Sequence, residues 1–181
     1  AASWGLAEPA HDMDALWGVV TASNNAEVRE GFRTYDSISG NYCFADQAGD
    51  IGYQYVGRMP KRPAWLLPVP GWDGAHEWDG SVPKAELPTD ENPPNGFIIT
   101  ANNRTTTPDY PHYLTFGATR FRADRLRELM DDIEEFSLEL MPELQSDIVS
   151  RPHLEAVGHL TSFEASDERA RSLQAMLGEW D

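Results

Sequence analysis

The segment NGFIITANNRTTTPDYP, residues 95–111, places side chains that donate hydrogen bonds directly after an apolar run. Residues 97–100 (FIIT) favour an extended strand, and they lead into Asn102, Asn103 and Arg104. Two interpretations are open on this pattern alone. The asparagines turn the chain where a strand ends, or one of them holds a donor for negative charge that develops during a reaction.

Other reactive residue types form no recognisable site. The five histidines include no pair four residues apart, and no cysteine or carboxylate cluster completes a metal site. The segment DQAGD at 46–50 lacks the alternating ligands and the final Glu of a calcium loop, so it is interpreted as a turn. DDIEE at 131–135 is typical of a solvated helix face. No phosphate-binding loop and no G-x-S-x-G motif occurs.

The charge balance excludes one class of partner. Asp and Glu number 30 against 14 Lys and Arg, and only Lys61 and Lys84 are lysine. Without a basic stripe the chain has no means of displacing counterions from phosphates, so we expect no nucleic-acid binding. An acidic, lysine-poor surface suits a high-salt environment. A halophilic source and an acidic protein from a GC-rich genome both remain open.

The length of 181 residues allows one ordinary domain or a piece of a larger protein. Apolar stretches such as AWLLPVP are short and broken by proline, so no membrane span is expected. No signal peptide is visible, and the opening AASWGLAEP is typical of the middle of a chain. We therefore expect a fragment or a processed subunit. The lone Cys43 is predicted to be a small buried side chain in a strand.

Three segments that differ in composition and in predicted secondary structure must position the candidate residues. Residues 1–37 predict a short strand (ASWGL) followed by helices. The first helix has an apolar stripe of Ala15, Leu16, Val19 and Val20, and the second begins after Ser23 or Asn24 as N-cap.

Residues 38–111 predict strands and turns. YCFA and IGYQYVG are expected to form a β-hairpin around DQAGD, with Ile51, Tyr53 and Tyr55 on one face. The stretch between the hairpin and the asparagines is rich in Pro and Gly and carries Trp65, Trp72 and Trp78. It is expected to pack as an ordered loop.

Residues 112–181 predict helices. Apolar residues recur at three- and four-residue steps from Phe121 to Phe136. A later helix is expected to begin near Ser166 and to bury four apolar side chains, Leu173, Met176, Leu177 and Trp180. Because helices and strands are segregated along the chain, the predicted class is α+β.

An ordered series of motifs in residues 41–111 resembles the penicillin acylase (penicillin amidase) family of N-terminal nucleophile hydrolases. The series is FADQAGDIGYQYVGRMPKR, then LPVPGWDGAHEWDGSVPKAELP, then NPPNGFIITANNR. The flanking SWGLAEP, RFRADRLRELM and LGEWD are similar to the family in a weaker way, so that the resemblance covers nearly the whole chain, 1–181. It implies an internal fragment of the large subunit of such an enzyme, within a four-layer αββα sandwich.

The resemblance also implies a mechanism for cleaving acyl amides. In the family, a serine, threonine or cysteine freed by self-cleavage attacks the amide carbonyl. Its own α-amino group, with a pKa near ~8, acts as the base. The side-chain amide of the second asparagine of the pair stabilises the oxyanion, which assigns that role to Asn103. The arginine at the head of the following helix, near substrate and nucleophile, corresponds to Arg120. For Arg120 a purely structural ion pair with Asp124 is the alternative.

Several implied features have no match here. No residue can be the nucleophile, since the chain starts with Ala1 and the pair Ser23–Asn24 falls at a helix start. The chain alone is therefore expected to be inactive. It would depend on the remainder of the large subunit and on a small subunit from the same precursor. The segment between Tyr110 and Arg120 is short, so none of the family's calcium ligands is assigned, and no cofactor is required for the chemistry.

The resemblance leaves the substrate and the setting open. Family members act on penicillins, cephalosporin precursors and acyl-homoserine lactones, and nothing in the sequence chooses among these small acyl amides. The family resemblance implies a periplasmic or secreted protein. A non-catalytic binding or structural domain that retains the acylase-like framework is the alternative function.

Overall fold

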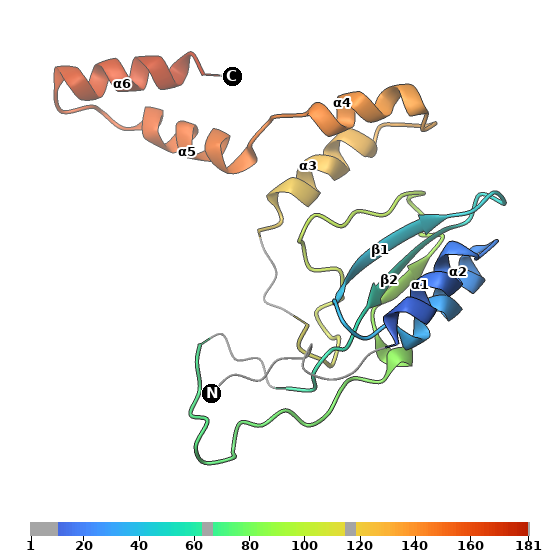
Figure 1. Ribbon diagram of the computed structural model, residues 1–181. Helices are drawn as coiled ribbons and strands as arrows, with labels where there is room; N and C mark the ends of the chain where they lie inside the picture. Colours follow the sequence, from blue (N-terminus) through green and yellow to red (C-terminus); the bar gives the residue numbers. More distant parts are fainter. Residues whose placement is uncertain (1–10, 63–66, 115–118, 181) are drawn as a thin grey trace. The chain divides into compact units, whose positions relative to one another are not determined.

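A computed structural model describes residues 11–62, 67–114 and 119–180, and all structural statements below concern these residues (Figure 1). The predicted ASWGL strand and Trp65 lie outside them. The chain divides into two compact units. The sheet unit comprises Ala1–Thr100 and Arg104–Ala118, and the helical unit comprises Ala101–Asn103 and Thr119–Asp181. Each unit is described separately.

The sheet unit contains the predicted hairpin, which is confirmed. Strands β1 (Gly40–Ala45) and β2 (Ile51–Val56) pair antiparallel, with Cys43 opposite Tyr53. In the turn between them, Asp46 accepts hydrogen bonds from the backbone N–H groups of Ala48 and Asp50 at 2.9 and 3.2 Å. A third strand, β3 (Thr89–Glu91), pairs with the other edge of β2, which makes β2 the central strand.

Two short helices and a 3-10 turn lie before the hairpin in the chain. They are α1 (Asp12–Val20), α2 (Asn25–Gly31) and η2 (Phe32–Thr34). Asn24 is the N-cap of α2, because its side chain accepts a hydrogen bond from the Glu27 N–H at 3.0 Å. The predicted apolar stripe of α1 is only half correct, since Ala15 is buried and Val19 packs on the core, whereas Val20 is 77% exposed.

The sheet unit has two small hydrophobic clusters. Ala15, Phe32, Tyr35 and Val56 join the helices to β2. Met59, Val82 and Leu87 form the second cluster, in which Val82 and Leu87 flank the 3-10 turn η3 (Lys84–Glu86). Residues 59–61 and 79–82 pair through backbone hydrogen bonds and bring together the ends of the loop that connects them.

Three local predictions are wrong in the sheet unit. Residues 97–100 are half-buried but join no strand ladder among the described residues, so apolar propensity was not enough to define a strand. Cys43 is exposed, although it lies in strand β1 as predicted. Trp72 is 86% exposed, so its indole contributes little packing, while the ends of its loop pair through backbone hydrogen bonds.

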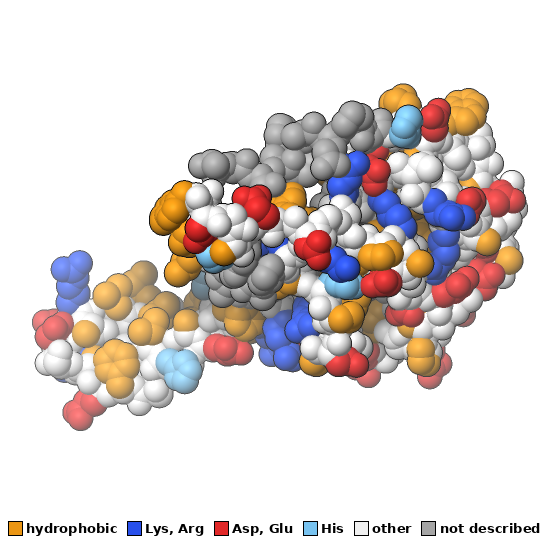
Figure 2. Space-filling model, turned by 90° about the horizontal axis from the view of Figure 1, so that it is seen from below, with side chains coloured by type: hydrophobic (Ala, Val, Ile, Leu, Met, Phe, Trp, Pro, Cys, Tyr) orange, Lys and Arg blue, Asp and Glu red, His pale blue; other side chains and the backbone are white. Residues whose placement is uncertain are grey.

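The helical unit consists of α3 (Phe121–Met130), η4 (Leu138–Leu140), α4 (Met141–Ser146), α5 (Arg151–Ser162) and α6 (Glu168–Gly178). Asp167 caps α6, one residue after the predicted start. The predicted burial on this helix is wrong: Leu173, Met176 and Trp180 are 51%, 67% and 45% exposed. Helices α5 and α6 contain no buried residue, and Figure 2 shows hydrophobic side chains on the surface of this lobe.

These elements confirm the α+β class. None of the helices in the described part of the chain combines the length and the apolar character that crossing a membrane requires.

An ion-pair network in the sheet unit makes a prediction about pH. The Asp36 carboxylate lies 2.7 Å from Lys84 Nζ and 3.2 Å from Arg58 Nη2. Burial on its own would raise the pKa of Asp36, but the hydrogen bonds and charges of Lys84 and Arg58 outweigh burial and lower it. A carboxyl whose pKa is lower in the folded state stabilises the fold above its unfolded pKa of about 3.9. That stability is lost as the pH falls through the folded pKa.

We therefore expect Asp36→Asn to lower the free energy of unfolding at pH 7 by on the order of 1 kcal/mol. The gap between wild type and variant should close as the pH falls below about 3.9. Urea unfolding at several pH values measures it, and a gap that stays constant from pH 7 to pH 3 would contradict the linkage.

Candidate functional site

The predicted oxyanion donor lies in a short turn, Ala101–Asn103, within the helical unit. Asn102 has a φ of 61°, the left-handed conformation that asparagine tolerates better than most residues. This conformation lets the chain fold back on itself, so that the Ala101 N–H donates to Asn103 Oδ1 at 2.8 Å. Ala101 is only 7% exposed, and its N–H is therefore satisfied by a side chain instead of a strand partner.

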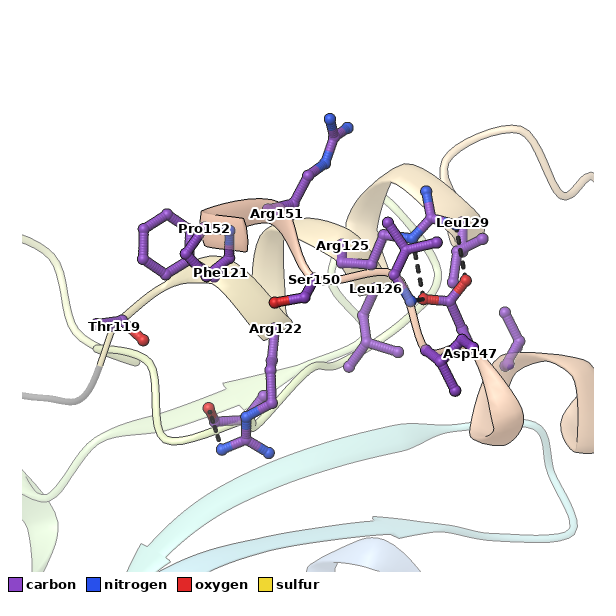
Figure 3. Close-up of a pocket in the computed structure, with 14 residues that line it drawn as sticks. Thr119, Phe121, Arg122, Arg125, Leu126, Leu129, Asp147, Ser150, Arg151 and Pro152 are labelled. Carbon is purple, nitrogen blue, oxygen red and sulfur yellow. Dashed lines mark hydrogen bonds and ion pairs between the residues drawn. The ribbon is translucent and has the colours of Figure 1, made fainter. Parts of the chain in front are cut away.

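Arg122, on the first turn of α3, binds the other side of the same turn. Its Nη2 donates to the Ala101 carbonyl at 3.1 Å and to Asn102 Oδ1 at 2.6 Å. Figure 3 shows the Arg122 side chain extending from α3 in the direction opposite to that of Arg151 of α5, with the bond to the carbonyl drawn as a dashed line. Arg122 was not predicted from the sequence, and it lies two positions beyond Arg120, which was.

These contacts orient the Asn103 side chain. Asn103 is half-buried, and its Oδ1 is occupied by the Ala101 N–H. An asparagine amide carries its acceptor and its two donor hydrogens at opposite corners. Fixing Oδ1 on the backbone therefore fixes the direction of Nδ2, the end that can donate to an oxyanion. The structure thus gives Asn103 a defined orientation, while its catalytic role remains a prediction.

Arg104 serves the segment that follows. Its Nη2 donates to the Thr107 carbonyl at 2.8 Å, and its Nε donates to Thr106 Oγ1 at 3.1 Å. These contacts agree with the expectation that Arg104 satisfies backbone groups after the apolar run.

Arg120 directly precedes α3 and forms an ion pair with Asp124, with 2.5 Å between Nε and Oδ2. The hydrogen bond that Arg120 donates to the Asp124 carboxylate raises the pKa of Arg120, and the same bond lowers the pKa of Asp124. The Arg120 side chain is 81% exposed. The ion pair with Asp124, which is the alternative role for Arg120, is therefore present. A role of Arg120 near the substrate stays a prediction.

A pocket of about 500 Å³ in the helical unit borders this site. Figure 3 shows α3 along one side and the α4–α5 connection along the other. Arg125 of α3 and Asp147 of the connection join these walls by two hydrogen bonds of 2.7 and 3.0 Å, which lower the pKa of Asp147. The remaining lining is mainly apolar: Phe121, Leu126, Leu129, Leu144, Ile148, Val149 and Pro152.

Metal binding finds no support in the described part of the chain, where no group of three or more His, Cys, Asp or Glu side chains could hold an ion. In the DQAGD turn, Asp46 accepts from backbone N–H groups and Asp50 accepts from Asn92. Residues 115–118, in the segment where calcium ligands were considered, lie outside the described residues.

Comparison with known proteins gives a consistent result. The family model described as penicillin amidase matches residues 1–181. The chain is 36% identical to a penicillin acylase 2 proenzyme of Pseudomonas sp. (strain SE83), over 91% of the chain and 22% of the relative. It is 31% identical to an acyl-homoserine lactone acylase, QuiP, of Pseudomonas syringae pv. syringae, over 93% of the chain and 22% of the relative.

A solved structure agrees with the sequence relatives. It is a thermostable penicillin G acylase from Alcaligenes faecalis, which is 28% identical to the chain. The TM-score is 0.65, and the match covers 91% of this chain and 31% of the solved one.

The two arginines at the start of α3 provide a matched pair of variants. Arg122→Met removes the donor that satisfies the buried Ala101 carbonyl, so we expect the free energy of unfolding to fall by about 1 kcal/mol. Arg120→Met removes only an exposed ion pair, so no measurable change is expected. Urea midpoints at constant slope measure both, and equal effects of the two substitutions would contradict the role given to Arg122.

Proposed function

Because the chain belongs to the penicillin amidase family, we propose that it is the part of an amide-cleaving acylase that supplies the side-chain donor of the oxyanion hole. The chain spans 22% of the length of the first curated relative. The complete protein would therefore contain further polypeptide, including the nucleophile, the rest of the large subunit and a small subunit from the same precursor.

One observation carries this proposal. Asn103 is held on the backbone by its acceptor atom, so that its donor atom is oriented before any substrate arrives. Oxyanion stabilisation requires donors that are fixed in advance, because reorientation during the reaction would cost part of the stabilisation. A mere turn asparagine needs only the acceptor bond. The family membership supplies the reason to assign the donor end a role as well.

The proposed reaction is acyl transfer to water in two stages. The hydroxyl or thiol of the nucleophile gives its proton to the α-amino group of the same residue and attacks the amide carbon, so that the π bond of the C=O group opens and negative charge collects on the oxygen. Asn103 Nδ2 donates a hydrogen bond to that oxygen, together with a backbone N–H from elsewhere in the large subunit. The C=O bond then re-forms as the C–N bond breaks, and the α-amino group passes the proton to the leaving amine. Water releases the acid from the acylated nucleophile in the second stage.

The other residues of the site receive supporting roles. Arg122 holds the turn through the Ala101 carbonyl and the Asn102 side chain. Arg120, on a solvent-exposed position before α3, is proposed to face the substrate once the complete protein is assembled. The substrate class is an acylated amine, since the relatives are named as penicillin and acyl-homoserine lactone acylases.

Asn103→Asp separates the structural and the catalytic roles of Asn103. Aspartate keeps an oxygen for the Ala101 N–H but replaces the donor with negative charge, so that the fold should survive and catalysis should fail. In the complete processed protein we expect kcat to fall by at least about 100-fold, the effect of losing one oxyanion donor. The measurement is hydrolysis of penicillin G and of an N-acyl-homoserine lactone, and a kcat within a few-fold of wild type would refute the assignment.

The isolated chain of 181 residues should show no hydrolysis of either compound, because the proposed mechanism needs a nucleophile from outside it. The complete processed protein should hydrolyse at least one of them. Activity in the isolated chain would contradict the division of roles, and inactivity of the complete protein on a broad panel of acyl amides would favour a non-catalytic binding domain.

A further inference from the structure

Both flanks of the asparagine turn are attached to one face of the β-hairpin within the sheet unit. Thr100 directly precedes the turn in the chain, and its Oγ1 lies 3.9 Å from Cys43 Sγ on β1. Thr105 follows Asn103 by two residues, and its Oγ1 lies 2.8 Å from the Tyr53 hydroxyl on β2. Cys43 and Tyr53 are direct cross-strand partners. We call these two contacts the flank anchors.

The contact between Tyr53 and Thr105 is the stronger of the two flank anchors. The Tyr53 hydroxyl donates to Asn41 Oδ1 on β1 at 2.7 Å. A tyrosine hydroxyl has a single hydrogen, so in the second contact Thr105 must be the donor and Tyr53 the acceptor. Both polar functions of the hydroxyl are therefore used. Tyr53 is only 3% exposed and lies on the central strand of the described sheet, where neighbouring strands restrain its backbone on both sides.

The Tyr53 hydroxyl keeps this arrangement over a wide pH range. Burial raises the pKa of Tyr53 to about 12, so that the side chain stays neutral under ordinary conditions. The cross-strand bond to Asn41 also fixes the ring relative to β1. The acceptor presented to Thr105 is therefore held in one place.

We propose that Tyr53 is a positioning residue for the oxyanion donor: through Thr105 it fixes the outgoing end of the turn that carries Asn103, while Cys43 and Thr100 restrain the incoming end. The proposal rests on the proposed function of Asn103. Residues 101–104 separate the two anchors, so the backbone between them has few conformations that satisfy both ends.

The expected consequence is specific to the transition state. A donor displaced by a fraction of an ångström still leaves the substrate room to bind, but it loses alignment with the developing oxyanion. Small displacements caused by distant substitutions can lower rates by up to about 100-fold. Loss of the anchor should therefore lower kcat and leave KM nearly unchanged.

Three variants of the complete processed protein test the anchor. Tyr53→Phe removes the hydroxyl, and Thr105→Val removes the donor that binds it while keeping the shape of the side chain. Each should lower kcat by roughly 10-fold or more, with KM within about two-fold of wild type. Thr105→Ser retains a hydroxyl and should restore kcat to near the wild-type value. The substrate is whichever of penicillin G or an N-acyl-homoserine lactone the wild type hydrolyses.

Tyr35→Phe is the matched control, because Tyr35 is a comparably buried tyrosine of the same unit, 6% exposed, whose ring packs against Phe32 and Tyr42 away from the anchors. It should leave kcat unchanged even if it lowers the unfolding midpoint. A kcat loss in Tyr35→Phe equal to that in Tyr53→Phe would overturn the proposal, since general destabilisation would then explain both.

Asn103→Asp, measured in parallel, distinguishes a failure of the Tyr53 anchor from a failure of the oxyanion assignment of Asn103. If it abolishes activity while Thr105→Val and Tyr53→Phe keep wild-type kcat, the anchor is wrong and the oxyanion assignment stands. If Asn103→Asp keeps full activity, the assignment fails and the anchor proposal fails with it. If Tyr53→Phe does not fold, the comparison of Thr105→Val with Thr105→Ser decides the question, because both keep the buried phenol.

Discussion

The backbone of Ala101 sets the constraint on which the site depends. Ala101 is buried and lies outside every helix and strand of the described chain, so neither its N–H nor its carbonyl has a ladder partner. Leaving both groups unsatisfied would cost several kcal/mol in total. Two side chains remove that cost: Asn103 accepts from the N–H, and Arg122 donates to the carbonyl. Each of these side chains is therefore fixed by a structural need before any reaction is considered, and the orientation of the Asn103 amide follows from that need.

The turn and the residue that follows it draw on distant parts of the sequence. Arg122 comes from the first turn of α3, 21 residues after Ala101. Tyr53 on β2 is 52 residues before its partner Thr105. Regular secondary structure satisfies its backbone locally, whereas an irregular buried turn must recruit partners from elsewhere in the chain. Within the helical unit α3 delivers Arg122 to the turn, and within the sheet unit the hairpin delivers Tyr53 to Thr105.

Local signals in the sequence predicted the elements well. The turn DQAGD between two β-rich runs defined the hairpin, and the chemistry of a helix start limited the N-cap to Ser23 or Asn24, of which the structure shows Asn24. Non-local quantities were not predicted. The exposure of Cys43, Leu173 and Met176 depends on which other parts of the protein cover the strand or helix face on which they lie. Residues 97–100 join no ladder in the described sheet, because strand pairing also depends on a partner strand elsewhere in the chain. The choice between Arg120 and Arg122 depended on helix phase: residues two apart point about 200° away from each other, so that only one of them faces the turn.

An acceptor bond at one end of an asparagine amide and a catalytic donor at the other are not competing explanations. A freely rotating amide would have to be ordered as the oxyanion forms, and the entropy of ordering would reduce the stabilisation that it gives. The bond from Ala101 removes that freedom in the resting protein. The structural role of Asn103 is in this sense the condition for the catalytic one. The pattern of an apolar run that ends in paired asparagines favours a turn when taken alone, and the family resemblance added the catalytic interpretation. The sequence shows the residue type, and the contact at Oδ1 shows how the amide is oriented.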